Sequence, residues 1–273
     1  MSNRNKAVTR KTRPTDSPGV TSSPTGEFIW GINPILEVLN FQSGRIRELQ
    51  ICKKNLSGKL KIIVNRAEEL GIPVIHTKTF QSISGSDTMH HQGVIAKIFP
   101  HETMTLNALL KKIESHASPT LLALDSILDP HNLGAIIRTA SAASIAGIIL
   151  PKDRTAPLSG TTAKVSAGAL AHIDICRVTN LAEALKQLKE HGFWIFGAQK
   201  TAATSIYQTE FSGPTCLVIG GEEKGIRPLV QKQCDHAITI PMTGRIDSLN
   251  ASVAAAIILF EVFRQKHIQN DPQ

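Results

Sequence analysis

From residue 120 onward the chain repeats one pattern: a short apolar run, a polar loop, and a longer segment with helical spacing of its apolar residues. Short apolar runs predict strands, and the longer segments predict helices. Such alternation predicts a mostly parallel sheet with helices on both faces, which is an α/β fold. The expected strands are 121–125, 147–150, 173–178, 193–196, 216–219 and 237–240, and the expected helices are 133–143, 163–169, 181–190 and 250–266.

The residues before this repeat predict a smaller α/β unit with its own sheet. The segment 46–51 alternates between apolar and polar residues, as a half-buried strand does. Pro34 fits the first turn of a helix, where no backbone N–H is needed. The expected elements are strands near Ile29 and at 46–51, 73–76 and 93–98, and helices that begin near Pro34 and at Lys59.

We therefore divide the chain into four parts. Residues 1–26 are basic and rich in Ser, Thr and Pro, with little to bury, which predicts a disordered tail. Residues 27–100 form the small domain, and residues 119–273 form the larger one. Residues 101–118 are the predicted linker, and the apolar spacing at 106–115 predicts a short helix within it.

Polar loops follow three of the predicted strands in the larger domain. Each loop carries Gly, Pro or Asn, and two of the three lead into a predicted helix. Ligands of open α/β sheets bind at the loops that leave the carboxyl ends of parallel strands, so we expect one composite site. Its candidate side chains are Asn132, Arg138, Glu222, Ser248 and Asn250.

Composition narrows the classes of function. No apolar run approaches the 18 or so residues of a membrane span, and the first 26 residues lack the apolar core of a secretory signal. The formal charge of +8 favours a polyanionic partner such as RNA. The four cysteines form no Cys-x-x-Cys pair and have no histidine at metal-ligand spacing. We therefore expect free thiols in a cytoplasmic protein, with no metal and no membrane attachment.

The phosphate-binding motifs common in α/β proteins are missing. No Gly-x-Gly-x-x-Gly turn follows the first strand of the larger domain, and no Gly-x-x-x-x-Gly-Lys-Ser/Thr loop occurs. The glycine cluster at 220–225 contains Glu222 and Glu223, which makes it a poor cradle for phosphate. NAD- and NTP-dependent enzymes are therefore disfavoured, and a ligand that is cationic or uncharged near this loop fits better.

The three loops resemble the three motifs of the SPOUT-class RNA methyltransferases, specifically those of the TrmH family of RNA ribose 2′-O-methyltransferases. The segment 91–93, His-Gln-Gly, resembles the small RNA substrate-binding domain of the RlmB-type members. The matching motif segments are 129–134 with Arg138, 219–225, and 240–244 with 248–250.

This resemblance implies a parallel sheet whose C-terminal part threads into a deep trefoil knot, with S-adenosylmethionine bound in the knot loops. It implies a homodimer whose site lies at or near the subunit interface. The implied reaction is methyl transfer from S-adenosylmethionine to a ribose 2′-hydroxyl of RNA, with a guanosine of 23S ribosomal RNA as the expected target. A transfer RNA, an antibiotic-resistance site in ribosomal RNA, and a non-catalytic RNA-binding assembly factor remain the alternatives.

The resemblance assigns Arg138 to activation of the ribose hydroxyl. Because arginine stays protonated, we expect its guanidinium to position phosphate or to stabilise a developing alkoxide. Glu222 is expected to orient Arg138 or the polar network of the site. Asn132, Ser248 and Asn250 are expected to position substrate or Arg138, and each also fits a helix N-cap.

Four further residues are expected to bind the cofactor. Gly220 would let the backbone approach S-adenosylmethionine closely. The other three, which are Ile240, Met242 and Leu249, would form an apolar slot for adenine with main-chain hydrogen bonds.

Overall fold

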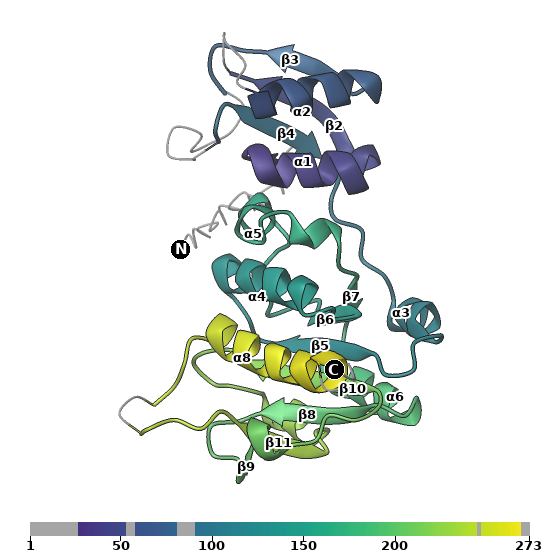
Figure 1. The fold of residues 1–273 in the computed structure, drawn as a ribbon, viewed down its shortest axis with the longest axis vertical. Coiled ribbons are helices and arrows are strands. Elements are labelled where there is room, and N and C mark those ends of the chain that lie inside the picture. Colours follow the sequence, from purple (N-terminus) through teal and green to yellow (C-terminus); the bar gives the residue numbers. More distant parts are fainter. Residues whose placement is uncertain (1–26, 53–57, 81–90, 245–246, 269–273) are drawn as a thin grey trace, which may run out of the picture.

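The computed structural model describes residues 27–52, 58–80, 91–244 and 247–268. The tail predicted at 1–26 lies outside these residues. The described chain contains two sheets, a small one built from the N-terminal residues and a larger one below it in Figure 1. No helix in the described ranges is long and apolar enough to cross a membrane.

The small sheet is mixed and has the strand order β1-β4-β2-β3. β4 pairs antiparallel with both β1 and β2, whereas β2 and β3 are parallel. The prediction of a small α/β unit is confirmed, and the strand 46–51 has the predicted bounds. The elements are β1 (Glu27–Trp30), α1 (Ile32–Phe41), β2 (Ile46–Ile51), α2 (Gly58–Glu69), β3 (Val74–His76) and β4 (Val94–Ile98).

The larger sheet has seven strands in the order β7-β6-β5-β10-β8-β11-β9, and every pairing in it is parallel. The predicted parallel α/β fold is therefore confirmed, while the trefoil knot stays a prediction. The strands are β5 (Thr120–Asp125), β6 (Gly147–Pro151), β7 (Ile175–Val178), β8 (Trp194–Ala198), β9 (Thr204–Ser205), β10 (Thr215–Gly220) and β11 (His236–Thr239). The helices are α3 (Leu106–Ile113), α4 (Pro130–Ala142), α5 (Gly160–Val165), α6 (Leu181–Glu190), α7 (Pro228–Gln231) and α8 (Ala251–Phe263).

Helices cover both faces of this sheet because its central strands are buried on both sides. All six residues of β5 are buried. Alternate residues face opposite sides of a strand, so Leu122 belongs to one apolar cluster and Leu121 to another. The first cluster includes residues of α4 and α8, and the second includes residues of α3 and α6.

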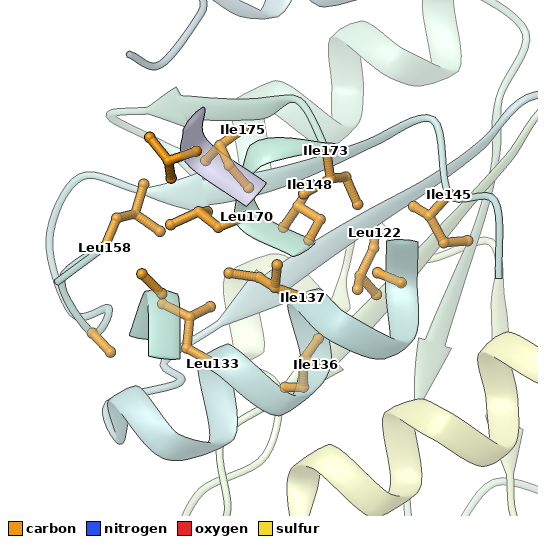
Figure 2. Close-up of a cluster of buried hydrophobic side chains, with 14 of the residues drawn as sticks. Leu122, Leu133, Ile136, Ile137, Ile145, Ile148, Leu158, Leu170, Ile173 and Ile175 are labelled. Atoms are coloured by element: carbon orange, nitrogen blue, oxygen red, sulfur yellow. The ribbon is translucent and has the colours of Figure 1, made fainter. Parts of the chain in front are cut away.

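The first cluster fixes α4 against the sheet. Leu133, Ile136 and Ile137 follow helical spacing and belong to the same buried cluster as Leu122 and Ile148 of the neighbouring strands (Figure 2). All five side chains are fully buried. Burial of a side chain of this size contributes about 1.5–3 kcal/mol. The packing therefore sets the position of the α4 N-terminus, which carries Asn132.

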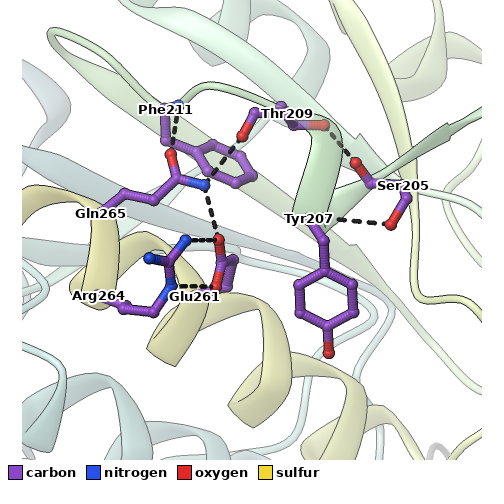
Figure 3. Close-up of polar contacts among 7 residues, drawn as sticks. All are labelled: Ser205, Tyr207, Thr209, Phe211, Glu261, Arg264 and Gln265. Atoms are coloured by element: carbon purple, nitrogen blue, oxygen red, sulfur yellow. Dashed lines mark hydrogen bonds and ion pairs between the residues drawn. The ribbon is translucent and has the colours of Figure 1, made fainter. Parts of the chain in front are cut away.

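The last helix is anchored at its C-terminal end by a polar network (Figure 3). The Gln265 side chain accepts a hydrogen bond from Phe211 N at 3.0 Å and donates one to Thr209 O at 3.0 Å. Gln265 also donates to Glu261, which accepts two further hydrogen bonds from Arg264. These contacts tie α8 to the segment before β10 and so hold the helix that starts at the candidate site.

The predicted linker does more than connect the two sheets. Four residues of α3 at helical spacing are buried in the second apolar cluster of the larger unit. Met104 also forms a bridge with Cys176 of β7. The buried residues of α3 are Leu106, Leu109, Leu110 and Ile113.

The small unit also contacts the larger one directly. The Glu37 carboxylate of α1 lies 2.7 Å from His172 Nε2, and Gln42 donates a hydrogen bond to Ala171 O at 3.0 Å. Helix 163–169 was predicted near this contact, but α5 ends at Val165. Ala167 and Gly168 have positive φ angles of 53° and 92°, which an α-helix cannot contain.

Candidate active site

The three predicted loops meet at the carboxyl ends of the larger sheet. β5 and β10 are neighbours in parallel register, with Asp125 opposite Gly220, so the loops that follow them start side by side. The loop after β10 contains Glu222, and α4, which follows β5, contains Asn132 in its first turn. Asn250 immediately precedes α8, which packs against α4.

Three side chains from these loops form one hydrogen-bonded group, the polar cluster of Asn132, Glu222 and Asn250. Glu222 Oε1 accepts hydrogen bonds from Asn132 Nδ2 at 2.8 Å and from Asn250 Nδ2 at 2.6 Å. Asn250 Nδ2 also donates to Asn132 Oδ1 at 3.0 Å. One side chain from each of the three motifs therefore meets the other two, as predicted.

The helix caps differ from two of the predictions. α4 begins at Pro130 and is capped by Asp129, which accepts a hydrogen bond from His131 N at 2.8 Å. Asn132 lies inside the first turn and uses its side chain for Glu222 instead. α8 is capped by Asn250, as predicted, and not by Ser248.

A pocket of about 390 Å³ adjoins the polar cluster. All four residues predicted to bind the cofactor line it, as do Glu222 and Ser248. The lining residues that the prediction did not name include Ile219, Ala254 and Ile258 on the apolar side and Gln199, Lys200 and Glu223 on the polar side.

The pocket fits S-adenosylmethionine in size and in chemistry. Small-molecule sites are mostly apolar cavities of about 300–1,000 Å³ with a few polar groups that orient the ligand. The apolar residues of this pocket suit an adenine ring, and its charged residues suit the ammonium and carboxylate of an amino acid. The role of each lining residue stays a prediction.

The glycines of this loop are required by the loop itself. A Cβ on Gly220 would lie 2.1 Å from Gly225 C and 2.3 Å from Ile226 N, far inside contact distance. A Cβ on Gly221 would lie 2.3 Å from Ser126 O. Gly221 and Gly225 pair as an antiparallel bridge. Close approach of backbone to backbone therefore explains Gly220, in addition to any approach to a ligand.

Arg138 stands apart from the pocket. It is exposed on α4 and is not among the pocket-lining residues. Six residues along a helix correspond to a rotation of roughly 240°, so Arg138 and Asn132 face different directions. Within the described ranges, Arg138 makes no hydrogen bond or ion pair. Glu222 was expected to orient either Arg138 or the polar network of the site. In the structure Glu222 contacts the polar network and does not contact Arg138.

Sequence reasoning missed Asp125, the last residue of β5. This side chain is 0% exposed. Its carboxylate accepts hydrogen bonds from Arg227 N at 2.8 Å and from Arg227 Nε at 2.7 Å. The sequence did carry a signal for it, since Asp125 directly ends a continuous apolar strand. A buried Asp requires a hydrogen-bonding or charged partner, so this position could have been recognised as a polar contact.

The cysteine side chains are free thiols throughout the described part of the chain, which confirms that prediction. Burial raises the pKa of Cys176 to about 11 and that of Cys234 to about 11. Burial also raises the pKa of Cys216. These thiols therefore stay protonated near neutral pH, in contrast to nucleophilic cysteines. Among the described residues, no group of three or more His, Cys, Asp or Glu is arranged to hold a metal ion.

Comparison with known proteins identifies relatives along most of the chain. The chain is 39% identical over 242 residues to the 23S rRNA (guanosine-2′-O-)-methyltransferase RlmB of Vibrio vulnificus, which covers 89% of this chain and 98% of that protein. It is 39% identical over 240 residues to RlmB of Escherichia coli, covering 88% and 99% of the two chains.

Two solved structures share the fold and contain AdoMet. An AdoMet-bound rRNA methyltransferase from Sinorhizobium meliloti has a TM-score of 0.72 and 25% identity, covering 88% of each chain. The SpoU methyltransferase AviRb from Streptomyces viridochromogenes, in complex with AdoMet, also has a TM-score of 0.72, with 22% identity over 88% of this chain and 90% of that one. The second likeness is one of fold alone.

Two family models account for the two units of the chain. The model for RNA 2′-O ribose methyltransferase substrate binding matches residues 28–104. The model for the SpoU rRNA Methylase family matches residues 119–260, which is more than half of the chain and includes all three motifs. The chain therefore belongs to the SpoU rRNA Methylase family.

Proposed function

We propose that this protein transfers a methyl group from S-adenosylmethionine to the ribose 2′-hydroxyl of a guanosine in 23S ribosomal RNA. The observation that carries the proposal is the polar cluster beside the pocket, because it joins side chains from all three motifs. The choice of guanosine and of 23S ribosomal RNA follows the activity of the RlmB relatives, which this chain matches over nearly their whole length.

Gly220, Ile240, Met242 and Leu249 would hold S-adenosylmethionine, which supplies an electrophilic methyl group when bound. The chain's own contribution is to orient the ribose hydroxyl toward that group and to exclude water. Alignment of reacting groups alone supplies about 7–11 kcal/mol in favourable cases. The apolar side of the pocket, including Ile240 and Leu249, would exclude water from the bound cofactor.

Glu222 is suited to hold the hydroxyl group. Its Oε1 accepts hydrogen bonds from both asparagine amides, so the carboxylate has one orientation. Within the described part of the chain, Oε2 has no hydrogen-bond donor. This oxygen can therefore accept a hydrogen bond from the ribose hydroxyl and draw its proton away from the attacking oxygen.

We further propose a homodimer in which Arg138 serves the pocket of the partner subunit. Arg138 is exposed and does not line the pocket of its own chain. α8 presents two apolar side chains to solvent, Val253 at 47% and Phe260 at 48% exposure. Such a face favours burial against another chain. The guanidinium would then position a phosphate or stabilise the developing alkoxide.

A mixture of two inactive variants tests this arrangement. Arg138→Ala and Glu222→Ala are each expected to be inactive as homodimers. In a mixed dimer, one site would have both native side chains, so random mixing should restore about a quarter of the native activity. If mixing restores no activity although mixed dimers form, Arg138 does not act on the partner subunit.

RNA binding is proposed for the small unit, and the cytoplasm is proposed as the place of action because ribosomal RNA is the substrate.

The decisive experiment maps ribose methylation in ribosomal RNA from cells with and without this protein. We expect one guanosine of 23S ribosomal RNA to lose its 2′-O-methyl group. Loss of a methyl group from a transfer RNA instead would identify transfer RNA as the substrate. If the purified protein transfers no label from S-adenosylmethionine to any unmodified RNA, the non-catalytic assembly factor becomes the better explanation.

A further inference from the structure

Asp125 contacts both ends of the loop that carries Glu222, with its main-chain oxygen at the start and its buried carboxylate at the end. At the start of the loop, the main-chain oxygen of Asp125 accepts a hydrogen bond from Gly221 N at 2.8 Å. At its end, the side chain accepts hydrogen bonds from Arg227 N at 2.8 Å and Arg227 Nε at 2.7 Å. One residue of β5 therefore determines where the loop begins and where α7 starts.

The loop between these two anchors forms one wall of the pocket. All of its residues from 220 to 226 line the pocket. The bridge between Gly221 and Gly225 makes the loop a tight hairpin, in which Gly225 N donates to Gly221 O at 2.9 Å. A hairpin this short moves as a unit, so a shift at Arg227 also moves Glu222 relative to Asn132.

Neither member of the Asp125–Arg227 pair lines the pocket. The Arg227 side chain is 33% exposed, whereas Asp125 has no exposure. A buried ion pair is often no more stabilising than apolar residues of the same volume. Its directional hydrogen bonds, however, permit only one geometry, because Arg227 offers a fixed planar donor group to the carboxylate. The pair is thus suited to setting the position of the loop.

We propose that Asp125, acting through Arg227, is a positioning residue for methyl transfer: it places Glu222 and the pocket wall in their working geometry. This inference rests on the proposed function for the reaction, but it concerns a contact that can be measured without RNA.

The test compares Asp125→Asn with a matched control, Asp235→Asn. The Asp235 carboxylate also binds one cation and one backbone amide, with Lys189 Nζ at 2.7 Å and Ile195 N at 2.9 Å. It lies at the amino ends of β8 and β11, away from the pocket. Both substitutions replace a carboxylate by an amide of the same shape, so both should lower the melting temperature.

Only Asp125→Asn is expected to affect the site. Calorimetry should show S-adenosylmethionine binding weakened about tenfold, as expected for loss of a charge-assisted contact that orders the wall. Hydrogen exchange at the amides of Gly221 and Gly225 should become faster, and kcat should fall as well. Asp235→Asn should keep native S-adenosylmethionine affinity, loop exchange and kcat.

Arg227→Gln provides a second variant that removes the side-chain half of the same link, the contact of Nε with the carboxylate, and keeps the main-chain contact of residue 227. Because both residues act through one contact, Asp125→Asn combined with Arg227→Gln should be no worse than the poorer single variant. This comparison keeps the proposal testable if Asp125→Asn fails to fold, since Arg227→Gln alone must then show the weaker binding and faster exchange.

Native S-adenosylmethionine affinity and native loop exchange in folded Asp125→Asn or Arg227→Gln would overturn the proposal. Additive effects in the double variant would overturn it too, since they would indicate two independent roles. If the native protein methylates no RNA, the proposed function fails, while affinity and hydrogen exchange still decide whether Asp125 positions the loop.

Discussion

The side-chain Nδ2 of Asn250 donates a hydrogen bond to Glu222 Oε1 at 2.6 Å, while the side-chain Oδ1 of Asn250 accepts one from Ser252 N at 2.9 Å and so caps α8. One side chain thereby joins the loop after β10 to the start of the last helix. Because α8 is held at its other end by the Gln265 contacts, the Glu222 carboxylate is attached to a rigid element and not to a free loop.

Glu222→Ala should reduce kcat strongly. The substitution removes the shared acceptor of Asn132 and Asn250, so both amides lose their orientation. Misplacement of a reacting group by about 1 Å lowers the rate about 100-fold, and we expect a loss of that size. Glu222→Gln keeps the acceptor for both asparagine amides but places an NH2 group where Oε2 lies, so it should retain their orientation, lose the acceptor for the ribose hydroxyl, and be impaired less than Glu222→Ala. Steady-state kinetics on unmodified 23S ribosomal RNA measures both, and near-native kcat in Glu222→Ala would contradict the proposed role.

Arg138→Ala should lower turnover strongly and retain cofactor binding. Arg138 does not line the pocket, so calorimetry should give native affinity for S-adenosylmethionine. Loss of a donor that stabilises a developing oxyanion lowers kcat by about 100- to 1,000-fold. Arg138→Lys keeps the charge without the planar donor group and should recover only part of the rate. Near-normal turnover of the alanine variant would remove Arg138 from the mechanism.

Gly220→Ala should weaken S-adenosylmethionine binding as well as stability. The added methyl group would overlap Gly225 and Ile226, so the pocket wall must move, and overpacking of this kind lowers stability by about 1–3 kcal/mol. Gly192→Ala is the control. Gly192 has a φ of 82° and open space around it, so alanine there should lower stability by about 1–2 kcal/mol through backbone strain alone. Equal affinities in the two variants would show that the Gly220 loop tolerates the shift.

Acidification should destabilise the protein through His101. Burial, followed by the neighbouring Arg45 guanidinium, lowers the pKa of His101 from 6.5 to about 4. Between these values the unfolded chain binds more protons than the folded one. The free energy of unfolding contributed by this group therefore falls as the pH decreases from 6.5 to 4, by an amount on the order of 2 kcal/mol.

His101→Asn should remove this part of the acid sensitivity. Urea unfolding near pH 7 and near pH 4 measures the free energy of unfolding for both proteins. The native protein should lose more of it than the variant between the two conditions. Equal losses would mean that His101 does not titrate in this range.

The periodicity of apolar residues determined most of the secondary structure. The segments 46–51 and 181–190 have their predicted bounds, and most other elements differ by a few residues at the ends. α5 was misplaced because Ala167 and Gly168 adopt positive φ, which apolar spacing does not reveal. The two-residue strand β9 and the four-residue helix α7 were not predicted, because such short elements have too few residues to show a period.

The sequence by itself determined that three polar loops follow strands of a parallel sheet, and its motifs indicated the family. Only the tertiary structure decided which side chains meet. Glu222 bonds to Asn132, 90 residues away, and Asp125 bonds to Arg227, 102 residues away. These contacts depend on β5 and β10 being neighbours, and strand order is set by the packing of the whole sheet. Local residue patterns extend over a few turns or strands, so they predict that a loop exists but not which side chains it contacts.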